Sequence, residues 1–180
     1  MKPILLLDVD GVLCVPGKDC QARVVKLEYA PGKCIPFWPN LHTERFLRMA
    51  WALFDVRWLT AWGSGANAIA RNYGLEERPT CPDQGGEEWK ARGAIRELAG
   101  DTRPVAWIED GITPFAKALA RRRGWVYVHC EPFVGAQPWH IEVLEDFARR
   151  ARAARPSSSS RAMKTLRKRI HAGNLSRRRA

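Results

Sequence analysis

The N-terminal residues form a pattern that few folds accommodate. Residues 4–7, Ile-Leu-Leu-Leu, are all apolar, which is typical of a strand buried on both faces in a parallel α/β sheet. The run ends abruptly at Asp8 and Asp10, and Gly11 follows them. Open α/β sheets bind their ligands outside the carboxyl ends of the strands. The sequence therefore predicts two carboxylates at a ligand-binding edge of a sheet.

Asp8 and Asp10 are two positions apart, so an extended backbone would point both side chains the same way. Two ionised carboxylates at short distance repel each other unless a cation or a shared proton lies between them. Mg²⁺, which prefers oxygen ligands, is the simplest cation for this position. The alternative is that both acids only cap the turn before Gly11, as acids before glycine often do.

Polar residues also follow two later apolar runs. Residues 55–60 form a predicted strand that ends in Thr60, and residues 104–108 form another that is followed by Glu109 and Asp110. A lone threonine at a strand end has no special meaning. A second acidic pair at a strand end is harder to explain structurally, because burying carboxylates without partners is costly.

Lys90 occupies an unusual place in a predicted helix over residues 87–100. Glu87 and Glu88 begin this helix, where the helix dipole favours acids, whereas a lysine in the first turn is electrostatically unfavourable. Lys90 is either a solvated surface residue or a group that reaches toward the strand ends.

The sequence DVDGVL at residues 8–13 resembles the first motif of the haloacid-dehalogenase-like (HAD) phosphohydrolases, and the resemblance extends over residues 2–134. It implies that Asp8 is a nucleophile that forms an aspartyl-phosphate and that Asp10 is the general acid and base. Thr60 matches the second motif, in which the hydroxyl and the next backbone N–H, here that of Ala61, hold the phosphate.

The third and fourth motifs complete this resemblance. Lys90, with Lys117 as the second candidate, would reach the nucleophile and the phosphate. Glu109 and Asp110 would complete a Mg²⁺ site together with Asp8 and Asp10. The fourth motif more commonly has two aspartates, so we expect Asp110 to be the direct ligand and leave the role of Glu109 open.

The predicted fold is α/β, a three-layer Rossmann-like HAD fold with a central parallel sheet. Residues 23–29 and 34–38 are a predicted hairpin, which the resemblance places as a small flap over the site. Only 51 residues separate Asp8 from Thr60, which leaves no room for a large cap domain. The remaining predicted elements are helices at 40–54, 65–73 (with Ser64 as N-cap), 113–123 and 138–154, a strand at 125–130 and a short edge strand at 78–81.

Charge divides the chain into a predicted domain over residues 1–154 and a tail over residues 155–180. Residues 151–180 hold ten of the 30 basic residues and none of the 19 acids, so the net charge of +11 belongs almost entirely to this end. Residues 156–160, Pro-Ser-Ser-Ser-Ser, read as a linker, and the basic run after them suits either a polyanion such as nucleic acid or a solubilising tail.

The five cysteines show no metal-finger spacing and no run approaches the length of a membrane span, so we expect a cytoplasmic protein with no membrane partner. We predict a Mg²⁺-dependent phosphatase acting on nucleic-acid phosphate ends or another bulky phosphorylated substrate. Residues 58–67 also resemble HAD domains associated with bacterial RNA-repair proteins. The alternatives are a small-molecule phosphatase with an incidental tail and a non-catalytic nucleic-acid-binding protein on the same fold. The oligomeric state is left open.

Overall fold

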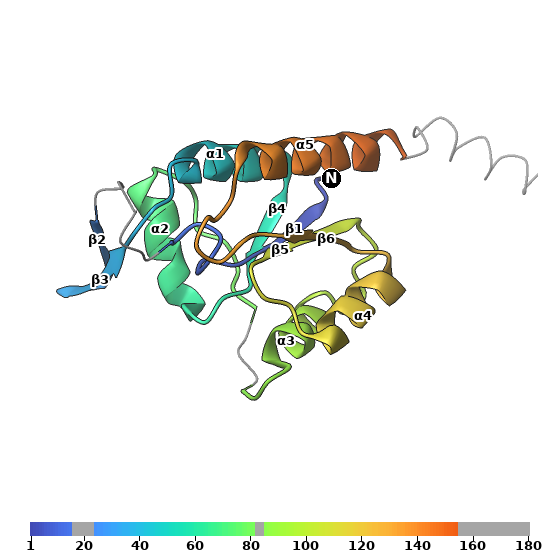
Figure 1. Ribbon diagram of the computed structural model, residues 1–180, viewed down its shortest axis with the longest axis horizontal. Coiled ribbons are helices and arrows are strands. Elements are labelled where there is room, and N and C mark those ends of the chain that lie inside the picture. Colours follow the sequence, from blue (N-terminus) through green and yellow to red (C-terminus); the bar gives the residue numbers. More distant parts are fainter. Residues whose placement is uncertain (16–23, 82–84, 155–180) are drawn as a thin grey trace, which may run out of the picture.

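The computed structural model describes residues 1–15, 24–81 and 85–154, which form a mixed α/β fold. At its centre lies a parallel four-stranded sheet with the strand order β4-β1-β5-β6 (Figure 1). The strands are β1 (Ile4–Leu7), β4 (Asp55–Trp58), β5 (Val105–Glu109) and β6 (Val126–His129). The prediction of a central parallel sheet is confirmed, and the arrangement is compatible with a Rossmann-like fold.

The apolar run at the N-terminus is the core of this sheet. Side chains alternate between the two faces of a strand, and those of β1 divide accordingly between two apolar clusters. Leu5 and Leu7 belong to one cluster, and Ile4 and Leu6 belong to the other. All four are fully buried. A strand with a cluster on each face needs helices on both sides of the sheet, which is why this run contains no polar position.

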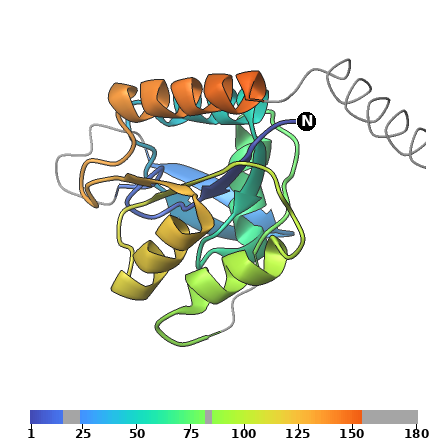
Figure 2. The same cartoon turned by 90° about the vertical axis from the view of Figure 1, so that its right-hand side faces the viewer.

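The helices form two layers around the sheet (Figure 2). Helices α1 (Thr43–Leu53) and α5 (Pro138–Ala153) lie side by side over one face, where Phe54 stacks on Phe147 with 6.3 Å between ring centroids. Helices α3 (Trp89–Glu97) and α4 (Pro114–Arg123) pack together over the other face. The short elements η1 (Gly63–Ala66) and α2 (Asn67–Asn72) follow β4. The described residues thus form three layers.

The predicted hairpin is confirmed. It consists of β2 (Val25–Ala30) and β3 (Lys33–Phe37), which pair antiparallel around a turn where Gly32 has φ of +70°. The hairpin packs against η1 and α2. At its end the ring of Phe37 meets Trp62 edge-on, 6.0 Å from it, so the hairpin contacts the loop that follows β4.

Several predicted helix boundaries are wrong by a few residues. Helix α1 begins at Thr43 because Asn40 Oδ1 accepts the N–H of His42, which makes a turn before the helix. Leu41 lies in this turn and is 91% exposed. Ser64 caps no helix, since it lies inside η1 and α2 follows directly.

Two further elements are shorter than predicted. Helix α3 begins at Trp89, so Glu87 and Glu88 precede its first turn. The edge strand predicted at 78–81 is reduced to a single bridge between Thr80 and Trp58.

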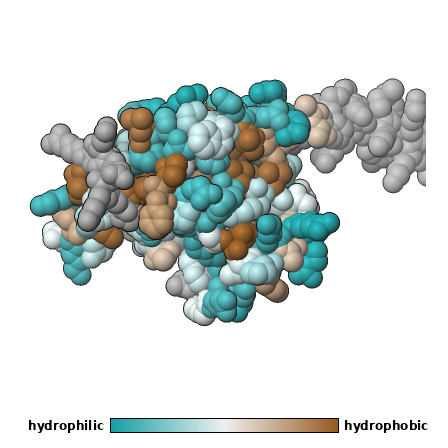
Figure 3. Space-filling view, in the orientation of Figure 1, coloured by the Kyte–Doolittle hydropathy of each residue, from teal (hydrophilic) through white to brown (hydrophobic). Residues whose placement is uncertain are grey.

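The surface drawn in Figure 3 is mostly hydrophilic, with separate apolar areas among the polar side chains.

None of the helices in the described part of the chain is long and apolar enough to cross a membrane. The linker and basic tail predicted at 155–180 lie outside the described residues, and so do residues 16–23 and 82–84.

Candidate functional site

The register of the sheet brings the ends of β1, β4 and β5 together. Leu7 is paired with Ile108 of β5, so Asp8 and Glu109 emerge next to each other at the carboxyl edge. The N–H of Asp8 donates to the Ile108 carbonyl at 3.3 Å, and the N–H of Leu59 donates to the Leu7 carbonyl at 2.8 Å. The strand pairing thus places three of the predicted motifs at one edge, as in other open α/β sheets.

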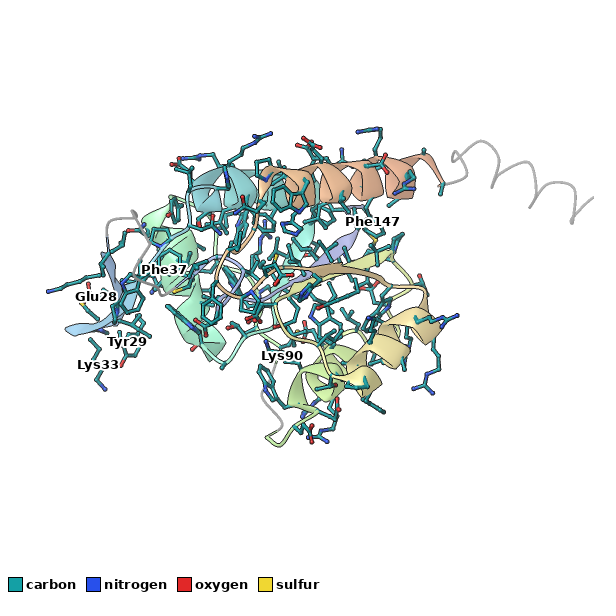
Figure 4. All side chains as sticks on the ribbon, in the orientation of Figure 1. Glu28, Tyr29, Lys33, Phe37, Lys90 and Phe147 are labelled. Carbon is teal, nitrogen blue, oxygen red and sulfur yellow. The ribbon has the colours of Figure 1, made fainter. Side chains whose placement is uncertain are left out.

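Lys90 connects helix α3 to this edge (Figure 4). Its Nζ donates to Asp8 Oδ2 at 2.8 Å and to Glu109 Oε2 at 2.7 Å. Asp8 is 3% exposed and Glu109 is 1% exposed. Lys117, the second candidate, is exposed on α4. The structure therefore brings Lys90, and not Lys117, into contact with Asp8.

The charges of this cluster shift the proton equilibria of its members. Burial alone would lower the pKa of Lys90, but the carboxylates of Asp8 and Glu109 raise the pKa above its usual value, so the ammonium stays charged. Burial and the neighbouring Asp8 raise the pKa of Glu109, and Lys90 opposes that shift. One ammonium faces two buried carboxylates, which leaves negative charge for a further cation or a proton to balance.

Asp110 adds a third carboxylate to the edge. Asp8, Glu109 and Asp110 each offer an oxygen atom, and these atoms lie within 4.8 Å of one another. Oxygens bound to one Mg²⁺ at about 2.1 Å can be at most about 4.2 Å apart, so small side-chain shifts would let all three reach the same ion. The donor set, two buried carboxylates and the half-buried Asp110, therefore fits Mg²⁺.

Gly11 is required for the position of Asp110. An ideal Cβ at residue 11 would lie only 2.0 Å from Asp110 Oδ2, and φ of Gly11 is +66°. A side chain here would meet the carboxylate and would strain the backbone. Glycine thus lets the loop after β1 pack directly against the loop after β5.

Asp10 does not join the three-carboxylate cluster. The chain turns after Asp8, because the Val9 carbonyl accepts the N–H groups of Leu13 and Cys14 at 2.8 and 2.9 Å. Asp10 Oδ2 instead accepts the indole N–H of Trp62 at 3.0 Å. Burial and the charge of Asp8 raise the pKa of Asp10, although the hydrogen bond from Trp62 opposes this.

Thr60 and Ala61 lie in the turn after β4. Thr60 is buried, and its Oγ1 accepts the N–H of Trp62 at 3.4 Å. Ala61 is exposed, and its N–H donates to no carbonyl group within the described ranges. The sequence reasoning missed Trp62, which contacts Asp10, Thr60 and the hairpin. The sequence feature that could have indicated Trp62 is its position directly before the glycine-rich turn at residues 63–65.

His129 and His140 have structural contacts, His129 at the end of β6 and His140 in the first turn of α5. His140 Nδ1 accepts the N–H of Gln137 at 2.9 Å, and its Nε2 lies 2.9 Å from the His129 carbonyl. The imidazole of His140 thus ties the start of α5 to the end of β6.

No family model matches this chain, and no curated protein matches it either.

Proposed function

We propose that the protein is a Mg²⁺-dependent phosphatase of the HAD type that hydrolyses phosphoric monoesters through an aspartyl-phosphate on Asp8. The observation that carries this proposal is the Lys90 ammonium held between Asp8 and Glu109 at the carboxyl edge of the sheet. A carboxylate nucleophile needs nearby positive charge before an anionic phosphate can approach it.

In the proposed reaction, an Asp8 carboxylate oxygen attacks phosphorus and forms an acyl phosphate, while the bond to the leaving alcohol breaks. Asp10 gives its proton to the leaving oxygen. Water then attacks the phosphorus of the intermediate and passes a proton to Asp10, which releases phosphate and restores the Asp8 carboxylate. The raised pKa of Asp10 supports the acid step, because it favours the protonated form.

Other residues would bind the phosphoryl oxygens. Lys90 supplies a charged donor, Thr60 a hydroxyl and Ala61 a backbone N–H. Bound Mg²⁺ would neutralise charge on the phosphoryl group. We infer that Asp8 and Asp110 are its direct side-chain ligands and that Glu109 mainly positions Lys90, to which it is hydrogen bonded at 2.7 Å.

The proposed substrate is bulky, such as a nucleic-acid end that carries a phosphate. Between Asp8 and Thr60 the described residues contain only the hairpin, α1 and β4, which supports a site without a large cap domain. Removing residues 155–180 tests the proposed contribution of the basic tail. We expect slower hydrolysis of phosphorylated DNA or RNA ends and unchanged hydrolysis of small esters. If the deletion changes neither the hydrolysis of nucleic-acid ends nor that of small esters, the result would favour the small-molecule alternative.

The catalytic proposal is tested by hydrolysis of p-nitrophenyl phosphate with Mg²⁺ and with EDTA. We expect activity only with Mg²⁺, and a loss of about three orders of magnitude or more in Asp8→Asn, because the amide is not a competent nucleophile. Asp146→Asn is the matched control, since Asp146 pairs with Arg149 and Arg150 on the surface of α5. Full activity in Asp8→Asn would overturn the assignment of the nucleophile.

A further inference from the structure

The indole of Trp62, in the loop after β4, is hydrogen bonded to the carboxyl group of Asp10. Its N–H donates to Asp10 Oδ2 at 3.0 Å, and within the described part of the chain this is the one hydrogen bond to that carboxyl group. The indole N–H groups of Trp51 and Trp58 donate instead to a backbone carbonyl and to a side-chain amide. Trp62 is thus the tryptophan that binds a carboxyl group, and this carboxyl group is the proposed general acid.

Asp10 depends on this contact because the residue is otherwise exposed. The turn at Val9 carries Asp10 away from the three-carboxylate cluster. The Lys90 ammonium donates to Asp8 and Glu109, so it does not orient Asp10 by a hydrogen bond. A general acid must be held close to the leaving oxygen, because a displacement of about 1 Å can lower a rate about 100-fold. A carboxyl group that changes rotamer freely would meet this requirement poorly.

Trp62 is itself held from two sides. Its ring meets the ring of Phe37 edge-on, with 6.0 Å between the centroids, and Phe37 is fully buried at the end of β3. The backbone N–H of Trp62 donates to Thr60 Oγ1 at 3.4 Å, and the N–H of Gly63 donates to the Thr60 carbonyl at 3.2 Å. The hairpin and the turn after β4 therefore fix the indole that binds Asp10.

The chemistry of the indole decides which oxygen of Asp10 carries the proton. An indole N–H donates a hydrogen bond and cannot accept one. In a protonated carboxyl group the carbonyl oxygen is the better acceptor, so the hydrogen bond to Oδ2 favours the proton on Oδ1. The ionised carboxylate accepts the same hydrogen bond from Trp62. Asp10 can therefore keep one orientation before and after it gives up its proton.

We propose that Trp62 is the positioning residue for Asp10, because its indole N–H holds Oδ2 and leaves Oδ1 to deliver the proton to the leaving oxygen. In this step Asp8 forms a bond to phosphorus, the bond from phosphorus to the leaving oxygen breaks, and the Oδ1 proton moves to that oxygen. Phe37 fixes the indole, which gives the hairpin an indirect part in the acid step. This inference rests on the proposed function and assigns a further residue to the same site.

Two esters with different leaving groups separate positioning from a general structural effect. Glycerol 2-phosphate releases an alkoxide that needs a proton, whereas p-nitrophenyl phosphate releases a stable phenolate. The quantity to compare is kcat/KM with Mg²⁺, which reports the steps through aspartyl-phosphate formation and not its later hydrolysis. Trp62→Phe keeps an aromatic ring beside Phe37 and removes the N–H. We expect kcat/KM to fall about 10-fold or more for glycerol 2-phosphate and less than about 3-fold for p-nitrophenyl phosphate.

A double-mutant cycle with Asp10→Asn shows whether Trp62 acts through Asp10. Asp10→Asn alone should lower kcat/KM for glycerol 2-phosphate about 100-fold or more. Adding Trp62→Phe should then cause less than about 2-fold further loss, because the acid is already absent. Trp51→Phe is the matched control, since it also loses one indole hydrogen bond, at 2.8 Å to the Glu76 carbonyl, and should affect both esters alike. Melting temperatures of all variants establish that they fold.

The rates of the wild-type protein distinguish the failure of this inference from that of the proposed function. If wild type hydrolyses both esters, equal losses on the two esters in Trp62→Phe would overturn the positioning role alone. Losses that add fully in the double variant would overturn it too, because Trp62 would then act independently of Asp10. If wild type hydrolyses neither ester with Mg²⁺, the proposed function is refuted, and the positioning role with it.

Discussion

Replacing Lys90 by methionine tests the electrostatics of the site. The side chain keeps a similar length, but the ammonium that contacts Asp8 at 2.8 Å and Glu109 at 2.7 Å is lost. At an effective dielectric constant of about 20, each contact corresponds to a Coulomb energy of about 6 kcal/mol. The cost of removing the ammonium from water, several kcal/mol, offsets much of this gain.

The net change in the free energy of unfolding depends on whether the two buried carboxylates stay charged or take up a proton. Removing one partner of a buried ion pair typically costs about 3–5 kcal/mol. The raised pKa of Glu109 means that this carboxyl can take up a proton when Lys90 is absent. We therefore expect the lower end of the range, a loss of about 3 kcal/mol in the free energy of unfolding.

The assay is urea denaturation at neutral pH in EDTA, with Lys117→Met as the matched control. Lys117 is exposed, so its replacement should change stability by less than about 0.5 kcal/mol. The deficit of Lys90→Met should shrink as the pH falls toward about 4.5, the ordinary pKa of a glutamate, because Glu109 is then protonated in the folded and in the unfolded chain alike. A Lys90→Met protein as stable as wild type at neutral pH, within about 0.5 kcal/mol, would refute this reasoning.

Two further predictions concern a loop glycine and a helix start. Gly11→Ala should lower Mg²⁺ affinity and stability more than Gly32→Ala, because both have positive φ but only Gly11 faces Asp110. Calorimetric Mg²⁺ titration and melting temperatures measure this, and equal effects would contradict it. Burial lowers the pKa of His140 from 6.5, so its contribution to stability is present above about pH 6.5 and is lost as pH falls through the lowered value. Urea midpoints should show this loss in wild type and not in His140→Gln.

The sequence determined the elements and their polarity. Four apolar residues at 4–7 required cover on both faces, and the structure divides them between two clusters. Polar residues at the ends of three runs predicted one functional edge, because parallel strands align their carboxyl ends. The periodicity of the sequence also predicted the hairpin and the C-terminal helix α5. The predicted start of a helix was wrong where a local turn, such as that at Asn40, competes with the helix.

Only the tertiary structure decided which of these residues meet. Asp8 lies 82 residues from Lys90 in the chain, and their contact at 2.8 Å follows from the packing of α3 against the sheet. Asp8 and Asp10 are almost adjacent in sequence, yet the turn at Val9 separates their carboxylates into different contacts. Local patterns fix which way a side chain faces, but distances between elements depend on packing that no single segment encodes.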